Sequence, residues 1–196
     1  IFHDNFIFYG GAEKICKFIS RSLKIKLVTS LKNNFLKNFF NLLIKNLYSF
    51  FYFFFLQNIK NLFNFYYFKF TIFSSNFSIF GSFFLRKKIL YLHHLPKFAF
   101  DKNYNLFLIL KIFIFFYKKF FYYFINNLDL IIFNSNYTRD LFHKNCNLNK
   151  KTKEMVLYPF SSGNIKNRPK INGPIICVSR YSRNKNIDLF IKIAKK

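Results

Sequence analysis

Residues 1–30 read IFHDNFIFYGGAEKICKFISRSLKIKLVTS, and they decide the fold class. Residues 1–6, IFHDNF, predict a short strand, and Gly10-Gly11 predict a tight turn after it. Apolar side chains then recur at the spacing of a helix: Ile15, Phe18, Ile19 and Leu23. Residues 25–30 return to a strand pattern. A strand, a helix and a second strand in this order indicate an α/β fold, a parallel sheet covered by helices.

The rest of the chain alternates between strand and helix patterns. Apolar runs predict strands at 69–76, 87–94, 130–133, 154–160 and 174–180. Helical spacing predicts helices at 103–127, directly after residue 135, and at 186–196. Residues 32–70 show no clean period.

A polar segment divides the chain into domains. Residues 161–173 are rich in polar residues, glycine and proline, which is typical of a linker. We therefore expect an N-terminal Rossmann-like domain at 1–160 and the first β-α unit of a second Rossmann-like domain at 174–196.

The composition is strongly basic and aromatic. The chain has 34 Phe and 13 Tyr, and its 32 Lys and Arg against 7 Asp and Glu give a net charge of +25. Such a charge favours anionic partners, either phosphorylated ligands or acidic lipid headgroups. No nucleic-acid partner is expected, because the sequence has no zinc-knuckle, helix-turn-helix or RNP-type motif. A/T-rich codons are an alternative source of the Phe and Lys, and this alternative stays open.

One segment raises the question of a membrane span. Residues 105–125 are long enough to cross a bilayer, but Lys111, Lys118 and Lys119 interrupt them. Charges near the centre of a span are costly, so an interfacial or buried amphipathic helix is the favoured interpretation. Peripheral contact with a membrane and a plain core helix are both open. An integral membrane helix stays open as an alternative.

The three cysteines are widely spaced and form no C-x-x-C pair. This pattern favours a reducing compartment over a disulfide framework or a zinc site. We expect a cytoplasmic location, at the cytoplasmic face of a membrane if the protein binds one.

Five segments, in order, resemble motifs of the family 4 glycosyltransferases, whose pair of Rossmann-like domains is called the GT-B fold. They are GGAEK (10–14), YLHHLPKFAFD (91–101), IIFNSNYTRDLF (131–142), VLYPF (156–160) and CVSRYSRNKNIDLFIKIAKK (177–196). The second segment is similar to a motif of a subgroup rich in mannosyltransferases. Residues 32–85 carry no resemblance, and single positions depart from the motifs: Leu95, Lys97, Phe160 and Tyr181.

The resemblance implies an enzyme, a retaining, metal-independent hexosyltransferase. It would move a hexose, mannose being favoured, from a nucleotide diphosphate sugar to a glycan or lipid-linked acceptor. GDP-mannose is the favoured donor, and no cofactor is implied. The E-x7-E segment of the family is absent from these residues, so the resemblance covers the first domain and only the start of the donor-binding domain.

The resemblance also assigns roles to individual residues. His93, and not its neighbour His94, would be the catalytic histidine in contact with the transferred sugar. Arg180 and Lys185 would bind the donor diphosphate, where fixed cations stabilise the charge that develops on the leaving phosphate. The sequence contains no D-x-D, so a metal-bridged diphosphate is not expected.

Two further groups end strands at the expected cleft. Gly10, Gly11 and Glu13 would form a loop beside the donor phosphates, since a helix N-terminus with close backbone approach suits an anion. Asn134 and Ser135 would line the cleft, with Ser135 or Asn136 also able to cap a helix. Simpler interpretations stay open: an ordinary strand-to-helix turn, a helix cap, and, for the whole chain, a non-enzymatic basic membrane-peripheral protein or an inactive transferase fragment.

Overall fold

The structure is a computed structural model, and it describes residues 1–5, 10–31, 42–63, 69–100, 108–149, 151–159, 176–177 and 186–194. The chain divides into two compact units, Ile1–Pro159 and Phe160–Lys196. The two Rossmann-like domains and the linker expected from the sequence remain predictions.

The first unit is built on a parallel sheet. In the part of the chain that the structure describes, this sheet has six strands in the order β2-β1-β3-β4-β5-β6, and every neighbouring pair is parallel. The strands are β1 (Phe2–Asn5), β2 (Val28–Leu31), β3 (Thr71–Phe73), β4 (Lys88–Leu92), β5 (Leu130–Phe133) and β6 (Lys153–Val156). The α/β class with a parallel sheet is confirmed, and the arrangement is consistent with a Rossmann-like fold.

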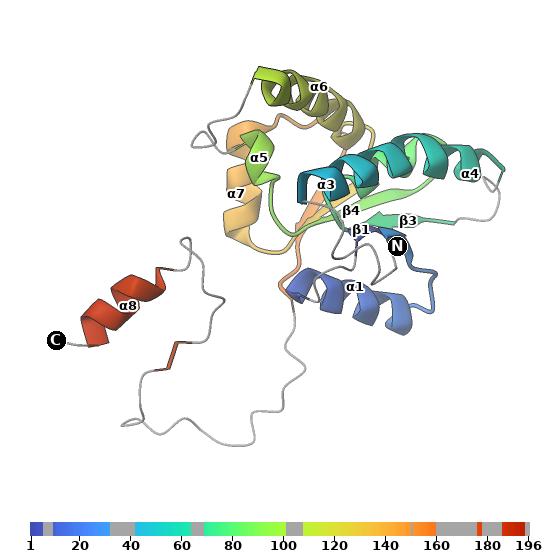
Figure 1. Ribbon diagram of the computed structural model, residues 1–196. Helices are drawn as coiled ribbons and strands as arrows, with labels where there is room; N and C mark the ends of the chain where they lie inside the picture. Colours follow the sequence, from blue (N-terminus) through green and yellow to red (C-terminus); the bar gives the residue numbers. More distant parts are fainter. Residues whose placement is uncertain are drawn as a thin grey trace. The chain divides into compact units, whose positions relative to one another are not determined.

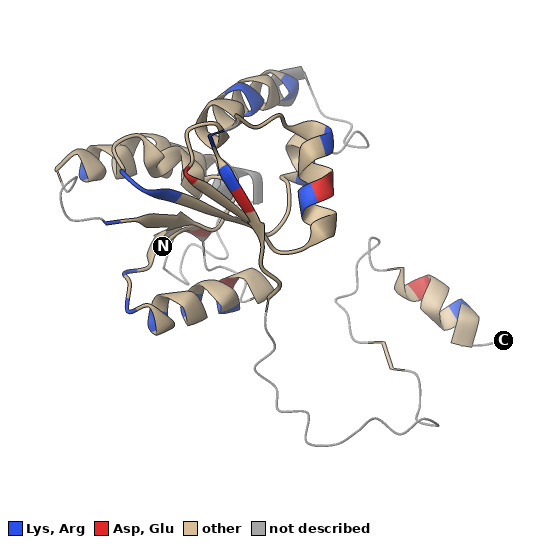
Figure 2. Ribbon diagram, turned by 180° about the vertical axis from the view of Figure 1, so that it is seen from behind, with Lys and Arg blue, Asp and Glu red and all other residues tan. Residues whose placement is uncertain are grey.

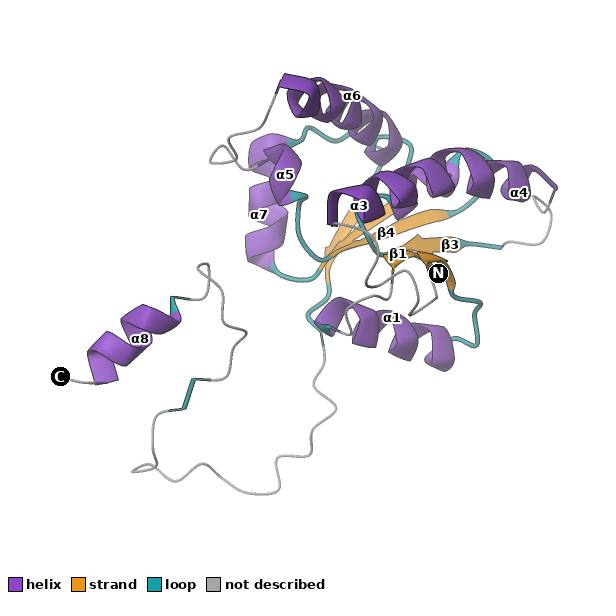
Figure 3. Ribbon diagram, viewed as in Figure 1, coloured by secondary structure: helices purple, strands orange, loops and turns teal. Residues whose placement is uncertain are grey.

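Helices cover both faces of the sheet (Figures 1 and 3). On one face lies α1 (Gly11–Ser22), and on the other lie α3 (Leu42–Phe51), the π-helix η1 (Tyr52–Gln57), α4 (Asn58–Phe63) and α6 (Leu108–Ile125). The shorter elements of this unit are the 3-10 helix η2 (Ser78–Ser82), α5 (Lys97–Phe100) and α7 (Asn136–Asn145). In the second unit the structure describes one helix, α8 (Ile187–Ala194).

Successive side chains of a strand point to opposite faces of the sheet, and each face carries its own hydrophobic core. Ile1, Ile72 and Tyr91 are buried on the face that Ile15 and Ile19 of α1 cover. The opposite face carries the larger core, which is mainly aromatic and includes Phe53, Phe73, Phe80, Phe121, Phe124 and Phe133. The high Phe content is therefore used in part to fill the space between the sheet and the helices of this face.

The structure refines several expectations. The helix expected at 103–127 is α6, and the helix expected at 186–196 is α8. Residues 32–70, for which the sequence shows no clean period, contain the helical segment α3–η1–α4. Apolar residues lie on both the buried and the exposed sides of this segment. The strand expected at 174–180 falls outside the described residues except for Ile176 and Cys177, which lie in no regular element. Among the described helices, none is long and apolar enough to cross a membrane.

Candidate functional site

The strand order creates a switch point beside β1. The chain places β2 on one side of β1 and β3 on the other. In open α/β sheets, ligands bind outside the carboxyl ends of the strands at such a point, because the crossovers there diverge to opposite faces. A cavity of about 180 Å³ lies at this edge. Its walls come from β1 (His3, Asp4), α1 (Ala12, Glu13), residues 74–76 after β3, and residues 91–94 at the end of β4 and directly after it.

A hydrogen-bonded cluster forms one wall of this cavity, and Ser74 is its centre. Ser74 Oγ lies 3.3 Å from His3 Nδ1, 2.6 Å from Cys16 Sγ and 3.3 Å from His93 Nε2. His3 Nδ1 is also 3.5 Å from Cys16 Sγ, and His3 Nε2 lies 3.8 Å from Glu13 Oε1. Strand β1, helix α1 and the residues that directly follow β3 and β4 thus all contribute polar side chains to one network.

The two histidines of the cluster have opposite protonation tendencies. Burial by itself lowers the pKa of His3, but hydrogen bonds with Cys16 and Glu13, with the charges of Cys16 and Asp4, raise it to about 10. Burial, reinforced by the charges of His3 and His94, lowers the pKa of His93 to about 4. At neutral pH His3 is a cation paired with Glu13, and His93 is a neutral imidazole.

The cavity wall holds the His93 ring in a defined orientation. Its ring packs edge-on against Tyr91, with centroids 4.8 Å apart and an interplanar angle of 73°. Together with the contact to Ser74, this packing limits the rotation of the imidazole. A neutral imidazole held in this way can donate one hydrogen bond and accept another at a ligand hydroxyl.

The neighbouring His94 differs in its environment. It also lines the cavity, but it is exposed, and its Nδ1 donates to the carbonyl of the adjacent Leu95, 2.9 Å away. The doublet thus combines one imidazole in the cluster with one at the surface. The exclusive role that the resemblance gives to His93 remains a prediction.

In the glycine loop, the Glu13 side chain binds the backbone of Gly10. Gly10 N–H donates to Glu13 Oε2 over 2.9 Å at the start of α1. Burial alone would raise the pKa of Glu13, but hydrogen bonds from His3 and Gly10 and the charge of His3 lower it. Neither Gly10 nor Gly11 adopts a left-handed conformation. Glu13 lines the cavity, whereas Gly10 and Gly11 do not, and their role as an anion loop stays a prediction.

Asn134 and Ser135 act at the start of α7. Ser135 is the N-cap, and its hydroxyl accepts a hydrogen bond from the Thr138 N–H over 3.2 Å. Asn134 Oδ1 accepts from the Thr138 hydroxyl over 2.6 Å. The capping interpretation is confirmed for Ser135. Neither Asn134 nor Ser135 lines the described cavity, so their role in the cleft remains a prediction.

Arg180 and Lys185 fall outside the described residues. Their assignment to the donor diphosphate rests on the resemblance alone. In the described part of the chain, no group of three or more His, Cys, Asp or Glu side chains is arranged to hold a metal ion.

The sequence interpretation misses His3, Cys16 and Ser74. Strand alternation puts His3 on the same face as Ile1, which is the α1 face, and Cys16 adjoins the partly buried row of Ile15 and Ile19. Those patterns bring His3 and Cys16 together. Ser74 joins them only through the pairing of β1 with β3, which no local pattern contains.

Comparison of the chain with protein-family models, curated proteins and solved structures gives no match. A functional assignment therefore rests on the cavity and on the resemblance of the five segments.

Proposed function

We propose that the chain is the acceptor-side domain, with the beginning of the donor-side domain, of a retaining family 4 glycosyltransferase with the GT-B fold. It moves a hexose, with mannose favoured, from a nucleotide diphosphate sugar to a glycan or lipid-linked acceptor. The donor is GDP-mannose by preference, and no metal takes part. The observation that carries the proposal is the neutral, oriented His93 at a cavity on the carboxyl edge of the sheet.

The protonation state of His93 suits glycosyl transfer. Positive charge develops on the sugar ring in an oxocarbenium-like transition state. A neutral imidazole can hydrogen-bond to a sugar hydroxyl without repelling that charge, whereas an imidazolium would oppose it. The nearby His3 cation contributes by keeping His93 unprotonated. His3 and Ser74 are therefore positioning residues, and His93 is the proposed catalytic residue.

The leaving diphosphate requires positive charge nearby. Negative charge builds on the diphosphate as the bond to the sugar breaks, and fixed cations stabilise it. Arg180 and Lys185 supply these cations in the proposal. The absence of a D-x-D motif from the sequence agrees with charge stabilisation by side chains.

A transfer assay tests the proposal. The full protein is incubated with a panel of nucleotide diphosphate hexoses, GDP-mannose first, and glycan or lipid-linked acceptors. We expect His93→Ala to lower kcat/KM by about a hundredfold or more, and the matched control His94→Ala to lower it by less than about tenfold. Arg180→Ala should remove most turnover. Equal losses in the two histidine variants, or near-normal kinetics of Arg180→Ala, would contradict the proposed roles.

A second candidate is a non-enzymatic, basic membrane-peripheral protein or an inactive transferase. Large apolar side chains exposed on the acid-free helices α4 and α6 favour it. The same assay separates the two candidates, because this one predicts no transfer with any donor and acceptor pair.

A further inference from the structure

The helices α4 and α6, with η1, expose large apolar side chains to solvent. We call six of them the aromatic face: Phe55, Ile59, Phe63, Ile112, Phe115 and Phe116. Each is more than half exposed, and Phe63 reaches 79%. Isolated exposed apolar residues are normal, but a contiguous group marks an interaction surface.

The six side chains form two rows, one on η1 and α4 and one on α6. Phe55, Ile59 and Phe63 recur every fourth residue, and Ile112 lies one helical turn before Phe115 and Phe116, so each set lies along one side of its helix.

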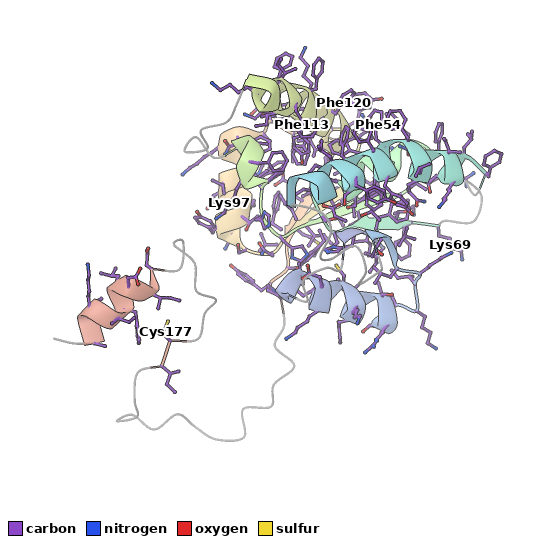
Figure 4. All side chains as sticks on the ribbon, viewed as in Figure 1. Phe54, Lys69, Lys97, Phe113, Phe120 and Cys177 are labelled. Carbon is purple, nitrogen blue, oxygen red and sulfur yellow. The ribbon has the colours of Figure 1, made fainter. Side chains whose placement is uncertain are left out.

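The α3–η1 segment, which continues into α4, packs beside α6 in one layer. The rings of Phe54 in η1 and Phe120 in α6 lie 5.2 Å apart, and those of Phe50 in α3 and Phe113 in α6 lie 5.8 Å apart. Figure 4 shows Phe54, Phe113 and Phe120 in this region. With these inner residues facing each other and the sheet, the exposed rows lie on the outer side of the layer.

The charge around the aromatic face has a single sign. Elements α3, η1, α4 and α6 contain no Asp or Glu, and their lysines are Lys45, Lys60, Lys111, Lys118 and Lys119. In Figure 2 these helices show blue segments and no red ones. Lys119 Nζ lies 4.6 Å from the centroid of the Phe115 ring, which places an ammonium group directly beside the aromatic row.

We propose that the aromatic face docks on the surface of a membrane that contains anionic lipids. The aromatic and aliphatic side chains would enter the boundary between headgroups and acyl chains, and the lysines would lie at the lipid phosphates. This is peripheral binding, since no described helix can cross a bilayer. Codon usage can raise the number of Phe and Lys residues, but it does not explain why they share an outer surface from which acidic residues are absent.

Charge favours a bilayer over a second copy of the chain. A symmetric contact between two aromatic faces would oppose lysine to lysine, and the surrounding elements offer no carboxylate to pair with them. Anionic headgroups supply the missing negative charge. No residue of the aromatic face lines the cavity beside β1, so docking leaves that cavity open. The inference does not depend on glycosyl transfer.

Vesicle co-sedimentation of the full chain tests the proposal. The vesicles contain phosphatidylcholine alone or with phosphatidylserine. We expect binding to the anionic vesicles that salt weakens. Replacing Lys60, Lys111 and Lys119 together by Gln should weaken it by roughly a hundredfold, at about fivefold for each lysine. The triple variant Phe55→Ser, Phe63→Ser and Phe116→Ser should weaken it by at least about tenfold.

Matched controls carry the same chemical changes elsewhere in the first unit. Lys14, Lys26 and Lys153 replaced by Gln remove equal charge, and Tyr137→Ser with Met155→Ser removes exposed apolar groups at residues that are 76% and 43% exposed. We expect each control to change binding by no more than about threefold. Far-ultraviolet circular dichroism and urea unfolding establish that each variant is folded.

Three results would overturn the proposal. The first is equal loss of binding in the control and test variants. The second is equal binding to neutral and anionic vesicles. The third is absence of vesicle binding together with self-association that the Phe→Ser variant abolishes, which would identify a second copy as the partner of this face.

Discussion

At the scale of single residues, the cluster around Ser74 gives two nearby histidines opposite pKa shifts. His3 has a carboxylate and a thiol within reach, and its pKa rises to about 10. His93 is buried near that cation, and its pKa falls to about 4. A pair of titratable groups whose environments separate their pKa values is typical of functional sites, and here it leaves the group nearest the proposed sugar uncharged.

The low pKa of His93 predicts a loss of stability in acid. In the unfolded chain His93 binds a proton near pH 6.5, whereas in the folded chain it does so only near pH 4. The stability that neutral His93 contributes is therefore present above pH 6.5 and is lost as the pH falls through about 4. Urea unfolding between these two pH values should show a steeper decline for the wild type than for His93→Asn. Parallel curves for the two proteins would contradict the lowered pKa.

The raised pKa of His3 changes the pH dependence of stability in the opposite direction. Its folded pKa lies above the unfolded one, so its contribution to stability is complete below pH 6.5 and is lost as the pH rises towards about 10. The His93→Asn comparison is not affected by this term as long as it is made below pH 6.5.

At the scale of elements, buried amides attach the α3–η1–α4 segment to the turn that follows β3. Asn58 Nδ2 donates to the Phe80 carbonyl over 2.8 Å, and Asn61 Nδ2 donates to the Gly81 carbonyl over 2.7 Å. Asp4 of β1 accepts a hydrogen bond from the Phe77 N–H over 3.1 Å. These bonds hold the segment around η2 in place, and so they support residues 74–76 at the cavity.

Gly81 provides a test of this packing. A Cβ atom at this position would lie 3.2 Å from Phe53 Cδ1 and 3.5 Å from Phe2 Cδ2, and both rings are buried. We expect Gly81→Ala to lower the free energy of unfolding by about 1–3 kcal/mol.

Gly11→Ala is the matched control. A Cβ atom there meets nothing within 4 Å, and the residue is the first of α1. Alanine should leave stability unchanged or raise it by up to about 1 kcal/mol. Urea unfolding measures both variants, and a harmless Gly81→Ala would show that the turn packs less tightly than described.

The elements that the sequence predicts are those with a clean contrast between buried and exposed positions. Helix α1 shows this contrast only in part, because Ile15 and Ile19 pack on the sheet while Phe18 and Leu23 are about half exposed. Strands β4 and β5 stand out as short apolar runs between polar residues. The α3–η1–α4 segment lacks it, because Phe occupies both its buried position 53 and its exposed position 55. The short elements η2 and α5 depend on tertiary contacts and leave no periodic signal.

At the scale of the whole molecule, the alternation of strands and helices predicts the parallel sheet but not the strand order. The position of β1 between β2 and β3 comes from long-range pairing, and it determines where the cavity lies. His93 can be proposed from its segment at the end of a strand. Its partners His3 and Ser74 cannot, since they reach it only through the assembled sheet.

The cavity and the aromatic face, which are the two surfaces with a proposed role, are separate on the first unit. The cavity lies at the carboxyl edge beside β1 and α1, and the aromatic face lies on the outer side of η1, α4 and α6. A protein attached to a membrane by this face would keep its cavity accessible to water-soluble donors and to acceptors at the membrane surface. This arrangement agrees with a lipid-linked acceptor in the proposed reaction.

The central claim is that the cavity beside β1 holds the ligand, and ring signals of the histidines test it directly. Nuclear magnetic resonance of the histidine-labelled protein would follow His93 and His143 during titration with a nucleotide diphosphate hexose and a glycan acceptor. His143 is the internal control, since it pairs with Glu154 at 2.9 Å and does not line the cavity. We predict that the His93 signals shift in a saturable way while those of His143 stay in place. Unchanged His93 signals at saturating ligand, or equal shifts in both residues, would contradict the account.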